Sequence, residues 1–187
     1  MGIRASILNP IVAALLLLIM TCFAAVAQDN GRLDDLFTRL KAADAAEAGR
    51  IESEIWIEWS KSGSPAMDLL LQRGRDAMAI GDNNTAIEHF TAIIDHSPDF
   101  AEAWNARATA YFGAGDFGPS VADIAQVLTL NPRHFGALSG LGTILEATGK
   151  TERALKVYQA ALALHPNLEG VNDAVLRLET EAEGQEL

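Results

Sequence analysis

The chain has 187 residues, a formal net charge of −11, and a composition that is 49% hydrophobic but only 6% aromatic. This length accommodates one modest domain with extensions rather than two independent cores. The acidic balance and the lack of Lys and Arg clusters exclude nucleic acid as a partner, because binding to phosphate backbones requires such clusters. The abundance of Ala and Leu favours helix over strand.

Residues 1–27 have the composition of a secretory signal peptide. Arg4 forms a short positive region, residues 11–20 are an unbroken apolar run, and Ala25-Val26-Ala27 offers small residues at the two positions that a signal peptidase reads. We therefore expect cleavage before Gln28 and an exported, periplasmic protein.

Two alternatives remain open for this segment. Residues 7–27 are about long enough to cross a bilayer, so an uncleaved segment would anchor the protein in the inner membrane. Cys22 is a candidate for lipidation, although Thr21 fits a bacterial lipobox poorly. Since Cys22 is the single cysteine, the cleaved chain forms no disulfide and offers no thiolate nucleophile or metal ligand. This layout is more typical of a bacterial envelope protein than of a eukaryotic secreted domain.

Residues 28–64 are predicted to be a helical N-terminal extension. Asp44 and Glu47 have the spacing of a capping box that begins the second of its helices. Ser62-Gly63-Ser64-Pro65 marks its end. Trp59 follows Ile55 at helical spacing and should be packed. Trp56 lies one step around the helix, a position that would allow an exposed interaction site. We expect it instead in the core or against the first repeat. The apolar positions are Leu33, Leu36, Phe37, Leu40, Ile51, Ile55, Trp56 and Trp59.

An internal repeat follows this extension. Pro98, Pro132 and Pro166 are each 34 residues apart, and units begun at Met67, Ala101 and Phe135 agree at further positions. The agreeing residues are Leu70, Trp104 and Leu138 at position four; Gly74, Ala108 and Gly142 at eight; Ala77, Tyr111 and Leu145 at eleven; Gly81, Gly115 and Gly149 at fifteen; Ala86, Ser120 and Ala154 at twenty; and Phe90, Ile124 and Tyr158 at twenty-four.

Each repeated position has a mechanical role. Small residues at positions eight and twenty let the two helices of a unit approach closely, and large apolar residues at four, eleven and twenty-four fill the space between helices. Glycine at fifteen tolerates the positive φ wanted just past a helix end. Proline at thirty-two terminates the second helix.

Residues 65–166 therefore resemble three tetratricopeptide repeats (TPRs), approximately 67–100, 101–134 and 135–168. The resemblance implies an all-α fold, in which three helix-turn-helix units form an α-solenoid with a right-handed superhelical twist. Residues 167–187 are predicted to be a C-terminal capping helix and tail, with Leu168, Val171, Val175 and Leu178 on one apolar stripe.

Two motifs that suggest chemistry have simpler explanations. Gly149-Lys150-Thr151 resembles the end of a phosphate-binding loop, but Ile144 stands where that motif needs glycine and no strand precedes it. The histidines form no pair with metal-ligand spacing. His96, His134 and His165 lie beside the turn prolines, where we expect partly exposed side chains. We predict no cofactor, no metal site and no catalytic residues.

The resemblance also implies a binding surface. In tetratricopeptide proteins the first helices of successive units line a concave groove that holds peptides or partner helices. Some members hold a chain-terminal carboxylate with Lys, Arg and Asn; the corresponding positions here are Leu71, Arg75, Ala106, Gly136 and Gly140, of which only Arg75 suits that role. Positions five, nine and twelve should face the groove, namely Leu71, Arg75, Met78, Asn105, Thr109, Phe112, Ser139, Thr143 and Glu146.

The sequence thus predicts a non-enzymatic scaffold that binds a protein or peptide in the bacterial cell envelope. The alternative is a structural or self-associating protein, whose Trp-bearing N-terminal helices form an oligomer interface. Contact with a membrane is expected only through the N-terminal segment, if that segment is uncleaved. The oligomeric state and the identity of the partner stay open.

Overall fold

The structure is a computed structural model that describes residues 31–185, so the expected signal segment at residues 1–27 lies outside it. Every regular element within residues 31–185 is an α-helix. None of these helices is long and apolar enough to cross a membrane. A helix over residues 31–42 comes first. It is followed by α2 (Ala45–Trp59), α3 (Pro65–Ala79), α4 (Asn83–His96), α5 (Ala101–Ala114), α6 (Phe117–Leu130), α7 (Phe135–Ala147), α8 (Thr151–Leu164) and α9 (Val171–Gln185).

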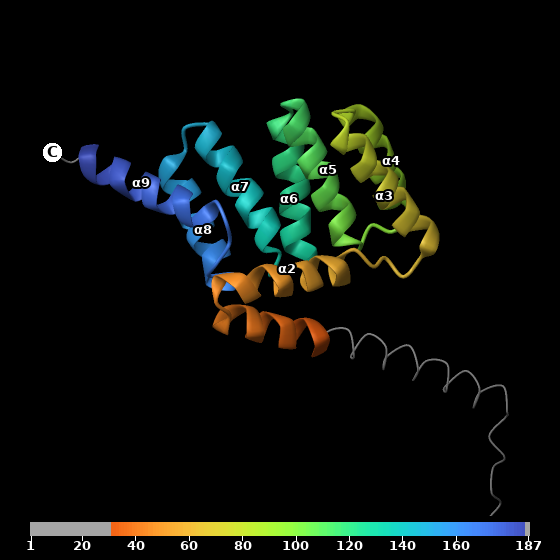
Figure 1. Cartoon of the computed structure of the whole chain (residues 1–187). Coiled ribbons are helices and arrows are strands. Elements are labelled where there is room, and N and C mark those ends of the chain that lie inside the picture. The colour runs from red at the N-terminus through yellow and green to blue at the C-terminus, as the bar shows by residue number, and fades with distance from the viewer. Residues whose placement is uncertain (1–30, 186–187) are drawn as a thin grey trace, which may run out of the picture.

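Helices α3 to α8 form three antiparallel hairpins that stack in a row, as Figure 1 shows. The hairpins are α3–α4, α5–α6 and α7–α8, and α9 packs on α8 at the far end. The apolar stripe predicted for the last helix, represented by Val171 and Leu178, is buried there. The predicted all-α repeat architecture is confirmed.

The helices of a unit touch where the sequence supplies a small residue at position eight. A Cβ atom on Gly74 would overlap the ring of Phe90, and one on Gly142 would overlap the ring of Tyr158. In the second unit Ala108 replaces glycine, and its carbonyl oxygen accepts a hydrogen bond from Oγ of Ser120 at 2.8 Å. Position eight therefore determines how closely each hairpin closes.

The turns follow the local rules that the sequence predicts. Gly81, Gly115 and Gly149 have φ values of 80°, 84° and 70°, a backbone conformation that strains residues with a Cβ atom. Helices α4, α6 and α8 each end two residues before a turn proline. Asp82 caps α4 by accepting the backbone N–H of Thr85 at 3.1 Å.

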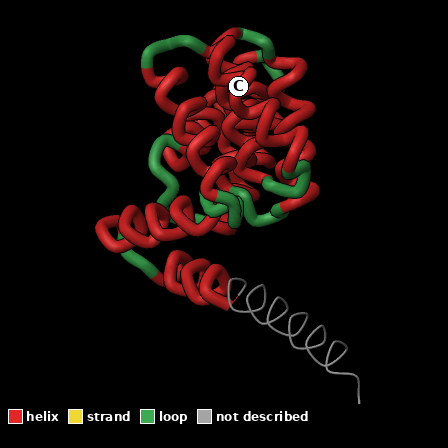
Figure 2. The backbone as a smooth tube through the Cα atoms, turned by 90° about the vertical axis from the view of Figure 1, so that its right-hand side faces the viewer, coloured by secondary structure: helices red, strands yellow, loops and turns green. Residues whose placement is uncertain are grey.

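The two N-terminal helices lie beneath the row of hairpins, with α2 running along it (Figures 1 and 2). Leu36 and Ile51 share a buried cluster with Phe135 of α7, Tyr158 of α8 and Val171 of α9. The extension therefore packs chiefly on the last repeat, although it precedes the first repeat in the sequence. Half of the expected capping box is present: Asp44 accepts the N–H of Glu47 at 2.9 Å, but the Glu47 carboxylate pairs with Arg50 instead.

This docking bears on two predictions. Trp56 packs against the buried cluster, which is one of its two expected positions, but the repeat it contacts there is the third and not the first, because Gly136 on α7 leaves space for its ring. His134 and His165 are both completely buried rather than partly exposed, because the N-terminal helices cover the turns that carry them. His96, whose turn is not covered in this way, is exposed as expected.

Candidate functional site

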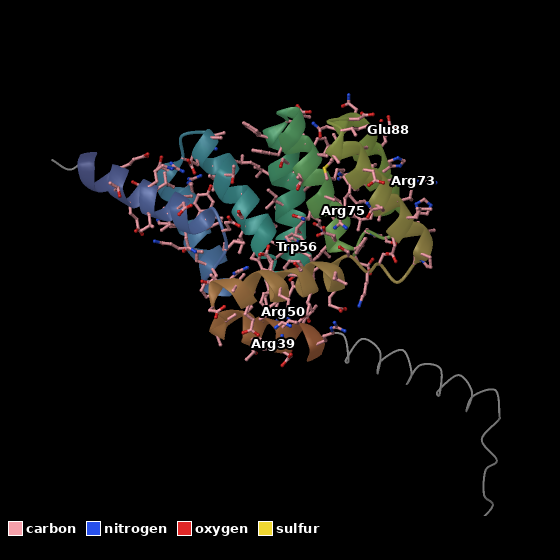
Figure 3. The ribbon with its side chains drawn as sticks, viewed as in Figure 1. Arg39, Arg50, Trp56, Arg73, Arg75 and Glu88 are labelled. Carbon is pink, nitrogen blue, oxygen red and sulfur yellow. The ribbon has the colours of Figure 1, made fainter. Side chains whose placement is uncertain are left out.

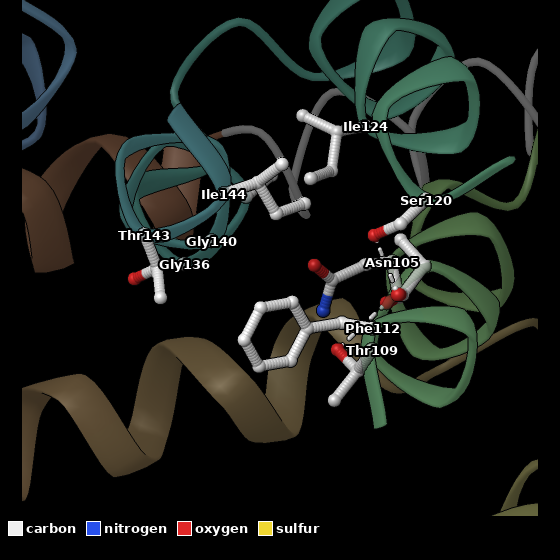
Figure 4. A pocket seen from close by; sticks show the side chains of 11 residues that line it. Asn105, Thr109, Phe112, Ser120, Ile124, Gly136, Gly140, Thr143 and Ile144 are labelled. Carbon is white, nitrogen blue, oxygen red and sulfur yellow. Dashed lines mark hydrogen bonds between the residues drawn. The ribbon is translucent and has the colours of Figure 1, made fainter. Parts of the chain in front are cut away.

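A cavity of about 120 Å³ opens between the second and third repeats. In Figure 4, Asn105 and Phe112 extend from α5 toward α7, which presents Gly136, Gly140 and Thr143. Ile124 and Ile144 form apolar walls. The complete lining is Asn105, Ala108, Thr109, Phe112, Ser120, Ile124, Gly136, Ala137, Gly140, Thr143 and Ile144, and none of these side chains is ionisable.

Polar oxygens lie at the rim of this cavity. The Thr109 hydroxyl donates to the carbonyl of Asn105 at 3.0 Å, and the Thr143 hydroxyl donates to the carbonyl of Ser139 at 3.1 Å. The side-chain amide of Asn105 donates one N–H to the Glu102 carboxylate at 3.2 Å. With their protons committed to the protein, both hydroxyl oxygens offer lone pairs to a ligand, although the Thr143 oxygen also accepts from the Tyr158 hydroxyl at 3.3 Å. The Asn105 amide adds an acceptor oxygen and its second N–H.

The structure brings four of the nine predicted groove residues to this cavity: Asn105, Thr109, Phe112 and Thr143. Met78 and Ser139 are partly exposed elsewhere, and Arg75 and Glu146 are held in ion pairs. Leu71 is 2% exposed, so its prediction as a groove residue is wrong. Its side chain is long enough to fill the buried cluster that also contains Ala103 and Ala106 of α5.

The rule for groove positions omitted the residues that form the depth of the cavity. Gly136 and Gly140, named from the sequence only as positions unsuited to a carboxylate clamp, stand one turn apart on α7. The Trp56 ring lies against Gly136, whereas Gly140 has Cδ1 of Ile124 at 3.8 Å from its Cβ position. Ile124 lies on α6, the second helix of its unit, so a rule restricted to first helices omits it. The stripe of two glycines was the available signal, because it marks a helix face that another backbone can approach.

A buried polar network lies beside the cavity and centres on Glu102, whose side chain is 3% exposed. Its carboxylate accepts hydrogen bonds from Arg75 at 2.6 Å and from Nε2 of His134 at 3.2 Å. Arg75 also donates to the Ser60 hydroxyl at 3.0 Å. The network joins α3, α5, the start of α7 and the end of α2. The cation that a carboxylate clamp would require is therefore already paired.

The hydrogen bonds of His134 determine its tautomer. Nδ1 accepts the backbone N–H of Ala137 at 3.0 Å, which caps α7, so Nδ1 carries a lone pair. Nε2 must then carry the proton that is donated to Glu102. The neutral imidazole thus serves as a helix cap and as a link between repeats, and Trp59 stacks on it with ring centroids 4.2 Å apart.

Glu52 of α2 forms a second polar link to the repeats. Its carboxylate accepts a hydrogen bond from Nε2 of His165 at 3.1 Å and another from Nε1 of Trp56 at 3.1 Å. The bond from His165 is the largest cause that holds the pKa of Glu52 below the ordinary value of 4.5; burial opposes it and the bond from Trp56 supports it.

Glu52→Gln is expected to make stability less dependent on acid pH. A carboxyl whose pKa is lower in the folded state adds stability above its ordinary pKa, and this contribution is lost as pH falls through the lowered value. The free energy of unfolding should differ more between wild type and Glu52→Gln at pH 5.5 than well below pH 4.5. Urea denaturation at several pH values measures this. A constant difference across the range would contradict the assigned role of Glu52.

Two of the three glycines of α7, Gly136 and Gly140, should respond oppositely to alanine. A Cβ atom on Gly136 would lie 2.6 Å from the Trp56 ring, so Gly136→Ala should loosen α2 and cost about 1–3 kcal/mol. A Cβ atom on Gly140 would meet only Cδ1 of Ile124 at 3.8 Å, so Gly140→Ala should stabilise α7 by about 0.5–1 kcal/mol through helix propensity. Thermal unfolding of both variants tests the pair. Equal effects would contradict the position of Trp56.

Stacked helical hairpins with a covered end and a capping helix define an α-solenoid, a class in which each unit contacts mainly its neighbours. The chain belongs to the tetratricopeptide repeat family, whose model matches residues 71–119 and 105–169.

Relatives and solved structures support this assignment. A TPR repeat-containing protein of Rhizobium etli is 41% identical over 136 residues, which cover 72% of this chain and 67% of that protein. Small glutamine-rich tetratricopeptide repeat-containing protein 2 of Saccharomyces cerevisiae is 31% identical over 67% of this chain, but the match spans only 35% of the yeast protein. The first TPR of Spaghetti bound to the HSP90 peptide SRMEEVD superposes with a TM-score of 0.60 at 26% identity, covering 63% of this chain and 95% of that domain.

Proposed function

We propose that this protein is a non-enzymatic adaptor that holds a segment of a partner protein in the cavity between its second and third repeats. The cavity carries the proposal, because apolar walls with a few polar groups at the rim are typical of ligand sites. The likeness to a TPR domain bound to a peptide supports it.

A self-associating role for the N-terminal helices has less support. Trp59 stacks on His134 of its own chain, and the indole N–H of Trp56 is bonded to Glu52. Figure 3 shows Trp56 on the side of α2 that faces the repeats. Since both tryptophans are engaged within the chain, the cavity is the better candidate for contact with a partner.

A photo-crosslinking experiment tests the adaptor function. A benzophenone amino acid is placed at Thr109 in the cavity, and at Ile80, which is 82% exposed and outside the cavity lining. Irradiation of cells should yield a specific adduct from position 109, and this adduct should disappear when Phe112→Ala is added. The same adducts from position 80, or none from position 109, would refute the proposed site.

We propose further that the adaptor works outside the cytoplasm, in the periplasm or anchored to the inner membrane. The proposal is supported by the apolar run at residues 11–20 and the small residues that follow it. Alkaline phosphatase fused after residue 187 should be active in a bacterial host, and deletion of residues 1–27 should abolish that activity. Phosphatase activity that survives the deletion would count against export through this segment.

A further inference from the structure

We propose that the occupant of the cavity is an uncharged, extended segment of the partner that inserts one aliphatic side chain between α5 and α7. This inference rests on the proposed adaptor function and specifies the partner that it would take. It separates this protein from the similar domain whose bound peptide, SRMEEVD, contains three acidic residues. Three features of the site support it: the acceptors at the rim, the paired charges around it and the size of the cavity.

The rim favours hydrogen-bond donors. The hydroxyl protons of Thr109 and Thr143 are directed to carbonyl oxygens of their own helices. A carboxylate placed here would meet oxygen lone pairs, whereas the backbone N–H groups of an extended chain would find acceptors. A partner helix satisfies most of its own N–H groups and would gain little from this rim. The rim chemistry therefore selects an extended segment.

The charged groups that flank the cavity are neutralised within the chain. Arg75 is bound to Glu102, and Glu146 is bound to Arg177 at 2.7 Å and to the Tyr158 hydroxyl at 3.1 Å. Both hydrogen bonds of Arg75, to Glu102 and to Ser60, come from Nη2, so the positive charge of Arg75 is already offset by a carboxylate that is 3% exposed. An acidic ligand that drew Arg75 away would leave that carboxylate buried without its cation. The net charge of −11 adds a general repulsion toward acidic segments.

The cavity has the size of one side chain. Its volume of about 120 Å³ is somewhat smaller than the roughly 150 Å³ of an apolar protein cavity that holds benzene. Phe112, Ile124 and Ile144 supply apolar walls suited to an aliphatic group. Gly140 has no protein atom nearer to its Cβ position than Cδ1 of Ile124 at 3.8 Å, so the main chain of a ligand can approach α7 there.

Selection from a displayed peptide library tests the inference. The purified full chain is offered random segments of roughly eight residues in two formats, one flanked by Gly-Ser linkers and one with a free carboxyl terminus. We expect the recovered sequences to come from the linked format, to lack Asp and Glu, and to share one aliphatic position. The selected peptides are then synthesised, and fluorescence anisotropy gives their affinities for the full chain.

Two variants connect the selected peptides to the cavity. Gly140→Leu fills the cavity and should weaken binding about ten-fold or more, since burial of one aliphatic side chain is lost. Phe112→Ala removes a wall residue that is 38% exposed and should also weaken binding. Gly49→Leu adds the same atoms on an exposed face of α2, where no atom lies within 4 Å, and should leave affinity unchanged. Circular dichroism verifies the helix content of each variant.

Recovery of acidic or carboxyl-terminal sequences would overturn the inference, as would unchanged affinity in both Gly140→Leu and Phe112→Ala. An empty selection together with a crosslinked partner at Thr109 would show that the occupant is not an extended segment, so the inference alone would fail. If the crosslink at Thr109 is also absent, the adaptor function itself fails. The two experiments therefore distinguish a wrong partner class from a wrong site.

Discussion

Replacing Phe135 with alanine is expected to lower the free energy of unfolding by about 3–5 kcal/mol, the range for truncating a fully buried aromatic side chain. The ring is 0% exposed and stands at the junction of the N-terminal helices with the third repeat. Its centroid lies 5.0 Å from that of Trp59, 5.1 Å from His165 and 5.7 Å from Trp56. Truncation would leave a void among these rings and detach α2 from α7.

Urea denaturation followed by tryptophan fluorescence measures this loss, since Trp56 and Trp59 report directly on the junction. In thermal unfolding, we expect the Tm of the Phe135→Ala variant to fall by about 10 °C. Hydrogen exchange should show amides of α2 losing protection first, because repeat proteins open in parts. Phe112→Ala is the matched control: its ring is 38% exposed, and its loss should cost less than about 1 kcal/mol. Equal destabilisation by the two variants would contradict the central position of Phe135.

Asp123→Ala is expected to lower the free energy of unfolding by about 3–5 kcal/mol, because it leaves the largely buried guanidinium of Arg107 without its carboxylate partner. Arg107 donates to both carboxylate oxygens of Asp123, with distances of 2.7 Å and 2.9 Å, and to the Thr91 hydroxyl at 3.0 Å. The side chains of Arg107 and Asp123 are 14% and 6% exposed. The hydrogen bonds to Asp123 raise the pKa of Arg107 above its usual value, so this guanidinium stays charged at any pH where the protein folds.

Asp34→Ala provides the matched control for this pair. Asp34 also binds an arginine, Arg133, at 2.6 Å, but it is 66% exposed and should contribute at most about 1 kcal/mol. The double variant Arg107→Met with Asp123→Ala should recover much of the stability lost by Asp123→Ala, because no unpaired charge remains. Chemical denaturation of the four proteins of this cycle gives the coupling. A double variant less stable than Asp123→Ala would show that the packing of Arg107, rather than the stranded charge, dominates.

The repeat fold could be predicted from sequence because its rules are local. Gly115 has a positive φ for a reason visible in its own residue type, and Pro132 cannot continue the interior of the helix that ends two residues before it. Gly74 and Phe90 are close in the chain, so their contact follows from the hairpin they share. Three copies of such local information were sufficient for the helices, their order and their pairing.

The candidate site was predicted only in part. A positional rule from the family names Asn105, Thr109, Phe112 and Thr143, and the structure brings these four residues to one cavity. It failed for Leu71, because the rule specifies the direction of a residue on its helix but not the depth to which neighbours cover it. It also could not show that Arg75 is already occupied, since its partner Glu102 lies in the next unit.

The sequence by itself determined the repeats, their turns and the capping helix, because each depends on residues within one unit or its neighbour. Only the tertiary structure decided where the N-terminal helices dock. Asp34 binds Arg133, which is 99 positions away in the chain, and Glu52 binds His165, which is 113 positions away. No spacing rule reaches across such distances, because several apolar surfaces could cover the same amphipathic helix. The fit of Trp56 over Gly136 selects one of them, and shape complementarity of that kind exists only once the repeats have folded.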